Sequence, residues 1–304
     1  MAPNHLISCQ DLSVEWVEDL FGLVDRLRPE DKPLKDIKIA TLFYEDSTRT
    51  RVSFELAAST LGAEVVSLNP RLMSLNKGES FLDTARTLEA LGVKSIIIRH
   101  PDSGAIDRLA ESLEKAASGL TLINAGDGMR EHPSQALLDL YTLKEALDDL
   151  QGKQILIVGD CLHSRVAKSN IDLLKKFGAQ ITLSGPPTLI PYCFERFGVN
   201  VNHNLDQALR EKDVIILLRL QQERQHKGLI ASLRDYSRGY LVSHERIIKA
   251  RLDLGDLKIM HPGPVNPGVE LESSLVDHPK ASLILRQVKN GLKVRMGILA
   301  KLLC

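Results

Sequence analysis

Short apolar runs alternate with amphipathic stretches along the chain, and this pattern constrains the fold more than any other feature. The runs that read as buried strands are Ile37–Tyr44, Val65–Leu68, Ser95–Ile98, Leu120–Ile123, Gln154–Val158, Gln180–Ser184, Val214–Leu218 and Leu257–Met260. Between them, apolar residues recur at helical spacing. Apolar strands that alternate with helices are typical of parallel sheets covered on both faces. The sequence therefore predicts an α/β protein with doubly wound parallel sheets.

The chain is long enough for two such sheets. Its 304 residues favour two domains over one, since a domain usually holds about 100–200 residues. A long helical pattern over residues 133–150 precedes a new strand–turn–helix unit. We place the boundary in that helix, which gives a first domain of residues 1–140 and a second of residues 141–288. The last helix, residues 289–304, is expected to pack back on the first domain.

Charge balance and cysteine spacing argue against several classes of protein. Lys+Arg and Asp+Glu number 39 each, so there is no cationic field for nucleic acid. No stretch approaches the ~18 apolar residues of a membrane span, and the N-terminus has no signal-like segment. We therefore expect a cytoplasmic protein that binds neither nucleic acid nor membrane. The four cysteines form no C-x-x-C pair, which predicts reduced thiols, no metal site and no cofactor.

A run of hydroxyl and arginine residues follows the first predicted strand and precedes a predicted helix. Its members are Ser47, Thr48, Arg49 and Thr50. At such a turn, free backbone N–H groups and the positive end of the helix dipole point outward. Hydroxyl and guanidinium groups add further donors, so the turn is suited to a phosphate. The alternative is an ordinary Ser/Thr N-cap beside a solvated arginine.

Other polar clusters stand at the ends of later strands, where open parallel sheets bind their ligands. They are Arg99-His100-Pro101, Glu131–Gln135, Asp160 with His163 and Arg165, Arg219–Arg224, and His261–Asn266. Singly, each has a simpler explanation: Pro133 after His132 suits the first turn of a helix, and a lone arginine is usually a surface charge. Gly159-Asp160 lacks the G-x-G-x-x-G of a dinucleotide site. Together, the recurring guanidinium groups predict a site for a small polyanion.

These motifs resemble those of the aspartate/ornithine transcarbamoylase family. The resemblance rests on Ser47-Thr-Arg-Thr-Arg51, Arg99-His-Pro101, His132-Pro-Ser-Gln135 and His163-Ser-Arg165, and it extends from Leu6 to the last helix. Two further motifs, Arg219-Leu-Gln221 and His261-Pro-Gly-Pro264, are similar to the catalytic chains of the aspartate-using branch. The ornithine branch carries a His-Cys-Leu-Pro turn in the latter place.

The resemblance implies an activity. The chain would transfer the carbamoyl group from carbamoyl phosphate to L-aspartate, giving N-carbamoyl-L-aspartate and phosphate in de novo pyrimidine biosynthesis. The first domain and the last helix would bind carbamoyl phosphate, and the second domain would bind aspartate.

The resemblance also implies the site residues. Around the phosphate would stand Ser47, Thr48, Arg49, Thr50 and Arg99, and around the carbamoyl group Thr50, Arg99, His132 and Gln135. Lys77 would reach in from a neighbouring subunit, and with Arg49, Thr50, Arg99 and His132 it makes up the expected catalytic set. Aspartate would be held by Arg165, Arg219 and Gln221 and by the backbone at Gly263 and Pro264. Glu45 and Arg224 would orient these arginines.

A site completed by Lys77 needs more than one copy of the chain, and the resemblance implies a homotrimer with shared active sites. The resemblance leaves open a larger assembly with regulatory chains or dihydroorotase.

Two positions depart from the family pattern. Met73 stands where the family usually has Ser or Thr, and Pro267 stands where it usually has Arg. We interpret them as an altered rim on an active enzyme. Two alternatives stay open: a nucleotide-dependent oxidoreductase, disfavoured by the missing glycine fingerprint, and a non-catalytic subunit, supported only by these two departures.

Overall fold

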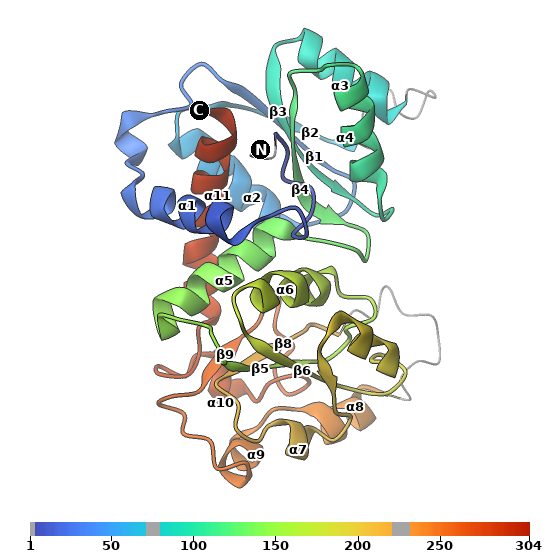
Figure 1. Ribbon diagram of the computed structural model, residues 1–304, viewed down its shortest axis with the longest axis vertical. Helices are drawn as coiled ribbons and strands as arrows, with labels where there is room; N and C mark the ends of the chain where they lie inside the picture. The colour runs from blue at the N-terminus through green and yellow to red at the C-terminus, as the bar shows by residue number, and fades with distance from the viewer. Residues whose placement is uncertain (1–3, 71–79, 221–231) are drawn as a thin grey trace. The chain divides into compact units, whose positions relative to one another are not determined.

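The computed structural model describes residues 4–70, 80–220 and 232–304 (Figure 1). The chain divides into two compact units, Met1–Tyr141 with Asn290–Cys304 as unit 1, and Thr142–Lys289 as unit 2. Each unit contains one sheet, and every strand pairing within the two sheets is parallel. The predicted fold class is therefore confirmed.

Unit 1 is built on a four-stranded sheet in the order β2-β1-β3-β4. Its strands are β1 (Lys38–Phe43), β2 (Glu64–Leu68), β3 (Val93–His100) and β4 (Thr121–Asp127). One face is covered by α3 (Phe81–Ala90) and α4 (Ala105–Lys115), whose apolar residues form one core with the sheet. The other side of the unit holds α1 (Val14–Arg26) and α2 (Thr48–Thr60), as Figure 1 shows, and Pro29–Asp31 form a 3-10 turn.

Two long helices belong partly to unit 1. The chain leaves the unit within α5 (Pro133–Leu147) and returns to it within α11 (Ile284–Leu303). The C-terminal part of α11 packs on α1, since Gly297 faces Val24 so closely that a β-carbon would overlap it. Lys301 lies over the ring of Trp16, 5.3 Å from its centroid. The prediction that the last helix packs back on the first domain is confirmed.

Unit 2 contains a five-stranded sheet in the order β7-β6-β5-β8-β9. Its strands are β5 (Gln154–Val158), β6 (Gln180–Ser184), β7 (Asn200–Val201), β8 (Val214–Leu217) and β9 (Lys258–Met260). Its helices are α6 (Arg165–Lys176), α7 (Leu205–Ala208), α8 (Leu233–Tyr240), α9 (His244–Lys249) and α10 (Ser273–Val276), with a 3-10 segment at Tyr192–Phe197. Apolar residues of α7, α9 and α10 form one core with β5, β8 and β9.

The apolar runs of the sequence correspond to strands in the structure, with three differences. The short strand β7 was not predicted, because two residues carry no pattern. Strand β3 continues through Arg99 and His100, and β4 continues through Asp127, beyond the predicted ends. Polar residues at the end of a strand still form hydrogen bonds with the neighbouring strand, so hydropathy underestimates strand length there. Among the helices of the described residues, none has the length and hydrophobicity needed to span a bilayer.

Candidate active site

The run of hydroxyl and arginine residues lies where predicted, between β1 and α2. Ser47 occupies the N-cap position of α2, yet its side chain makes no capping hydrogen bond to that helix. Thr48, Arg49 and Thr50 form the first turn, in which there is no acidic residue. Thr50 is buried, whereas Thr48 and Arg49 are exposed. The first turn of α2 therefore places no carboxylate of its own at the positive end of the helix dipole, which suits an anion.

Arg99, at the end of β3, lies against this turn. Its Nη1 donates a hydrogen bond to Ser47 Oγ over 3.1 Å, and its Nε donates to Glu45 Oε2 over 3.2 Å. Both side chains of the ion pair are mostly buried, Arg99 at 14% and Glu45 at 20% exposure. Neighbouring strands β1 and β3 thus bring a guanidinium group next to the N-terminus of α2. The structure places Glu45, Ser47 and Arg99 together.

His132 and Gln135 lie at the start of α5. The carbonyl group of His132 accepts hydrogen bonds from the backbone N–H groups of Gln135 (2.9 Å) and Ala136 (3.3 Å). Pro133 therefore begins the helix, as its fixed backbone angle favours. Gln135 Nε2 donates to Asp139 Oδ1 over 2.9 Å, one turn further along. His132 and Gln135 are buried, at 3% and 8% exposure.

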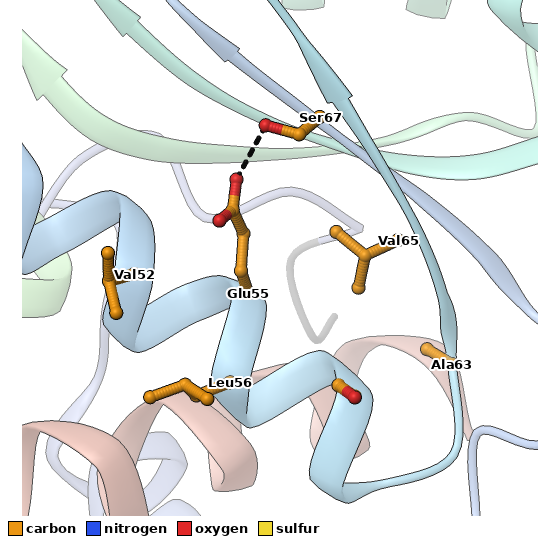
Figure 2. Close-up of a pocket in the computed structure, with 7 residues that line it drawn as sticks. Val52, Glu55, Leu56, Ala63, Val65 and Ser67 are labelled. Atoms are coloured by element: carbon orange, nitrogen blue, oxygen red, sulfur yellow. Dashed lines mark hydrogen bonds between the residues drawn. The ribbon is translucent and has the colours of Figure 1, made fainter.

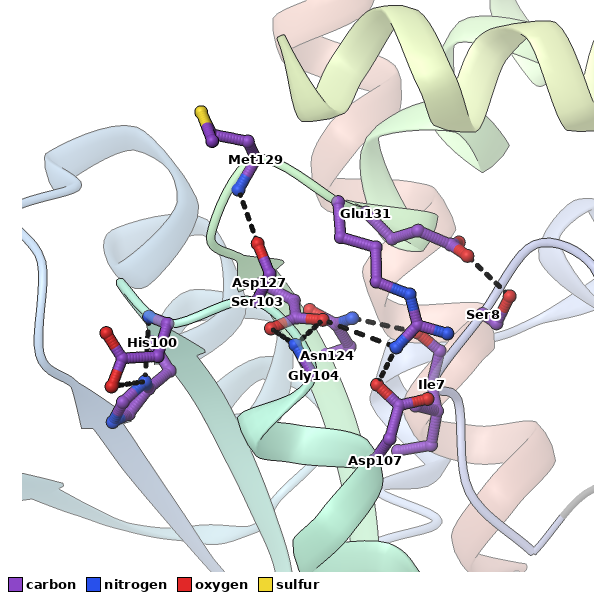
Figure 3. A network of polar contacts seen from close by, with 12 residues as sticks. Ile7, Ser8, His100, Ser103, Gly104, Asp107, Asn124, Asp127, Met129 and Glu131 are labelled. Carbon is purple, nitrogen blue, oxygen red and sulfur yellow. Dashed lines mark hydrogen bonds and ion pairs between the residues drawn. The ribbon is translucent and has the colours of Figure 1, made fainter. Parts of the chain in front are cut away.

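The loop before His132 is held by carboxylates that the sequence analysis did not assign (Figure 3). Both oxygens of Asp127 accept hydrogen bonds from the backbone N–H of Gly104, over 2.9 and 3.0 Å. Glu131 accepts from Ser8 Oγ (2.6 Å) and from the backbone N–H of Cys9 (2.7 Å). Because partners 122 and 123 residues away hold Glu131, no local pattern could have revealed this role.

His100, next to Arg99, has a structural environment. Its ring lies 4.7 Å from the ring of Tyr44 and 5.5 Å from that of Phe81, centroid to centroid. Its Nδ1 accepts a hydrogen bond of 3.0 Å from the backbone N–H of Asp102. Burial lowers the pKa of His100. A neutral ring that packs in a cluster with Tyr44 and Phe81 supports β3 and α3 rather than binding an anion.

In unit 2, the turn after β5 presents Arg165. Asp160 is fully buried, and its two oxygens lie 2.9 and 3.0 Å from Nδ1 of His163. Ser164 caps α6 by accepting a hydrogen bond of 3.1 Å from the backbone N–H of Ala167. Arg165 is the first residue of α6 and is 3% exposed. The Asp160–His163 pair, which the sequence analysis noted without a role, thus shapes the turn that carries this arginine.

Arg219 and the Gly263-Pro264 turn follow the neighbouring strands β8 and β9. Arg219 is partly buried and comes two residues after β8 ends. His261 Nδ1 accepts a hydrogen bond of 2.8 Å from the backbone N–H of Gly263. These positions are at the carboxyl ends of parallel strands, as the sequence predicts. Lys77 and Gln221, together with Met73, Ser74 and Arg224, lie outside the described residues, so their placement stays a prediction.

A groove on unit 1 lies apart from the predicted site residues. It has a volume of about 350 Å³ and is lined by Val52, Glu55, Leu56, Ser59, Ala63, Val65 and Ser67 (Figure 2). These residues come from α2, from the strand β2 and from the turn that joins them. Glu55 crosses the groove to accept a hydrogen bond of 2.7 Å from Ser67 Oγ. The groove therefore shares a helix with the turn of Ser47–Thr50, called the phosphate turn below, but none of the polar residues of that turn.

The two halves of the chain match two domains of one family. Residues 4–145 match the carbamoyl-phosphate-binding domain of aspartate/ornithine carbamoyltransferases, and residues 151–302 match their aspartate/ornithine-binding domain. The chain belongs to the aspartate/ornithine carbamoyltransferase family, as the motifs of the sequence indicated.

Several relatives with high identity are named as aspartate carbamoyltransferases. The aspartate carbamoyltransferase catalytic subunit of Thermosynechococcus vestitus is 44% identical over 310 residues, covering 97% of this chain and 93% of that protein. The catalytic subunit of Desulfitobacterium hafniense is 52% identical over 265 residues, covering 87% and 82%. The aspartate transcarbamoylase of Trypanosoma cruzi, solved with N-(phosphonacetyl)-L-aspartic acid, has a TM-score of 0.84 at 28% identity, covering 99% and 96% of the two chains.

Proposed function

We propose that this chain transfers the carbamoyl group of carbamoyl phosphate to the amine of L-aspartate, which gives N-carbamoyl-L-aspartate and phosphate in pyrimidine biosynthesis. The observation that carries the proposal is the Arg99 guanidinium group, held by Glu45 and Ser47 beside the N-terminus of α2. The arrangement offers a phosphate both charge and hydrogen-bond donors. Relatives named for this activity match the chain over most of its length.

The reaction needs no covalent intermediate with the enzyme. The aspartate amine attacks the carbamoyl carbon, the carbonyl oxygen becomes an oxyanion, and the bond to the phosphate oxygen then breaks. We assign Thr50, Arg99 and His132 as donors to the oxyanion. Removal of one such donor typically costs roughly 3–4 kcal/mol of transition-state stabilisation. Arg49 and the helix dipole stabilise the departing phosphate, and this phosphate takes the proton that the amine loses.

Positioning supplies much of the remaining acceleration. Two anionic substrates repel each other in solution, and holding them in a reactive orientation is worth up to ~7–11 kcal/mol. Ser47, Thr48 and Arg49 would hold the phosphate end of carbamoyl phosphate, and Gln135 would contact its carbamoyl group. Gln135 is itself oriented by Asp139. These groups therefore act on the geometry of the substrate more than on its electronic structure.

The residues of unit 2 that we assign to aspartate, called the aspartate half of the site, explain the choice of substrate. Arg165 and Arg219 supply two guanidinium groups, and Gln221 would add an amide. This set suits the two carboxylates of aspartate and repels the second ammonium group of ornithine. The backbone at Gly263 and Pro264 would line the same half.

A homotrimer is part of the proposal, because Lys77 would enter the phosphate turn of a neighbouring copy. The exposed face of α2 supports contact with such a copy, since Val52 and Leu56 are 41% and 52% exposed beside the groove of Figure 2. This apolar surface lies on the helix that carries the phosphate turn. Native mass measured with and without cell extract distinguishes a trimer from a larger assembly with regulatory chains or dihydroorotase.

A substrate assay tests the proposed activity. We expect carbamoyl transfer to L-aspartate and negligible transfer to L-ornithine. Arg219→Ala should raise the KM for aspartate strongly while calorimetry finds carbamoyl phosphate binding nearly intact. Arg210→Ala, which removes an exposed arginine of the same unit, is the matched control. Absence of turnover in the wild type would instead support a non-catalytic subunit, and equal loss of both affinities in Arg219→Ala would contradict the division of the site.

A further inference from the structure

A buried carboxylate joins the two loops that follow β8 and β9. The side chain of Glu270 is fully buried, and its Oε1 accepts hydrogen bonds from the backbone N–H of Leu220 (3.0 Å) and from Asn266 Nδ2 (2.7 Å). Its Oε2 accepts from the backbone N–H of Asn266 over 2.7 Å. Leu220 is the residue between Arg219 and Gln221, and Asn266 lies two residues beyond Pro264. One side chain thus contacts both segments of the aspartate half.

His261 completes the group. Its Nδ1 accepts a hydrogen bond from Gly263, so the ring hydrogen of the neutral imidazole lies on Nε2. This Nε2 is 3.8 Å from Glu270 Oε2. The backbone N–H of His261 donates to Gln287 Oε1 over 2.9 Å. The His261–Pro264 turn is therefore anchored on one side to α11 and faces Glu270 on the other.

We propose that Glu270 is a positioning residue for aspartate: it fixes the backbone at Leu220 and Asn266, and so aims Arg219 and the Gly263-Pro264 backbone at the substrate. This inference rests on the proposed function. It uses no contact between Glu270 and substrate, because the carboxylate is buried and its oxygens already accept three hydrogen bonds.

Only a carboxylate satisfies these donors. Three N–H groups converge on its two oxygens, and an ionised acceptor binds them more strongly than a neutral one. Burial acts to raise the pKa of Glu270, but the nearby His261 ring and the hydrogen bonds from Leu220 and Asn266 outweigh it and lower the pKa. The turn of Asn266 to Glu270 is closed by Glu270 itself.

The test is Glu270→Gln, which keeps the shape of the side chain but turns an NH2 group toward one of the three donors. We expect the KM for aspartate to rise by about tenfold or more, the loss typical of a charge-assisted hydrogen bond, with carbamoyl phosphate affinity unchanged. Glu272→Gln is the matched control. Glu272 also accepts a hydrogen bond from a backbone N–H, that of His244 at 2.9 Å, but no predicted site residue adjoins it. The Glu272→Gln variant should therefore keep the wild-type KM for aspartate.

Two further measurements test the positioning role of Glu270. Asn266→Ala removes one donor and leaves the charge, so it should give a smaller rise in the same KM with a normal thermal unfolding curve. An unchanged KM for aspartate in Glu270→Gln, or equal losses of affinity for both substrates, would overturn the positioning role. Turnover by the wild-type enzyme is measured in parallel. If the wild type transfers carbamoyl groups while Glu270→Gln behaves normally, this inference fails and the proposed function stands.

Discussion

Arg99 donates a hydrogen bond of 3.1 Å from Nη1 to Ser47 Oγ. The bond joins the end of β3 to the residue before α2, 52 positions earlier in the chain. Glu45 holds the other edge of the same guanidinium group through Nε. The orientation of Arg99 is therefore set before any substrate binds, and this lowers the entropy cost of ordering its side chain on binding.

Loss of the carboxylate at Glu45 should loosen Arg99. We expect Glu45→Gln to weaken carbamoyl phosphate binding by about three- to tenfold, which corresponds to one partly exposed ionic hydrogen bond. Isothermal calorimetry measures the change directly. Asp46→Asn, at the exposed neighbouring position, is the control and should bind normally. Identical affinities in the two variants would mean that Glu45 does not orient Arg99 for binding.

Arg295 on α11 should be important for the stability of unit 1. Its Nη1 donates to Ser53 Oγ over 2.9 Å, and its guanidinium carbon lies 5.0 Å from the ring centroid of Phe54. Burial lowers the pKa of Arg295 to about 10, and the charge of Asp139 opposes that shift. Removing a buried cation whose charge offsets that of a buried carboxylate typically costs about 3–5 kcal/mol. Urea denaturation of Arg295→Ala should detect this loss, whereas Arg286→Ala, at an exposed site on the same helix, should change stability by less than about 0.5 kcal/mol.

His100 should make stability depend on pH below neutrality. Burial beside Tyr44 and Phe81 lowers its pKa from 6.5, so the unfolded chain takes up this proton first as the pH falls. Stability is then lost from about pH 6.5 downward, through the folded-state pKa. His100→Phe removes this contribution, and its denaturation midpoint should fall less than that of the wild type between pH 7 and pH 5. Parallel pH profiles of the two proteins would show that His100 is not protonated differently on unfolding.

Subunit mixing examines the shared site. Arg49→Ala and Lys77→Ala should each be inactive, yet reassembly of the two should restore activity because some interfaces contain no mutation. With random mixing in equal amounts, about one site in four is intact in a cyclic trimer. Mixed trimers verified by native mass but lacking any recovered activity would mean that each site lies within one chain.

Substitution of Met73 tests the loop that contains Lys77. A thioether cannot donate a hydrogen bond to phosphate, whereas a serine hydroxyl can, a difference of roughly 1.5–3 kcal/mol. If the loop keeps the family register, Met73→Ser should tighten carbamoyl phosphate binding about tenfold and Ser74→Ala should be nearly silent. If the register is shifted by one residue, which we favour, Ser74→Ala should be damaging and Met73→Ser should do little. No change in either variant would leave Lys77 as the only contribution of the loop.

Much of the fold follows from local sequence. Apolar runs such as Gln154–Val158 and Val214–Leu218 predict parallel strands, because a strand buried on both faces must be apolar along its whole length. The position of Ser47–Thr50 at a strand-to-helix turn is equally local. The sequence did not predict the two-residue strand β7 or the polar ends of β3 and β4, because hydrogen bonding to a neighbouring strand, not hydropathy, defines them.

The α/β class, the strands that make the sheets, and the polar turns at their ends can all be read from the sequence, since each depends on residues close together in the chain. The side chains that hold those turns in place could be identified only once the chain was folded. Glu131 binds Ser8 across 123 positions, Glu270 binds Leu220 across 50, and Arg295 reaches Ser53 across 242. A buried charge is stable only when specific partners surround it, and those partners are chosen by how strands and helices pack, which no local pattern encodes.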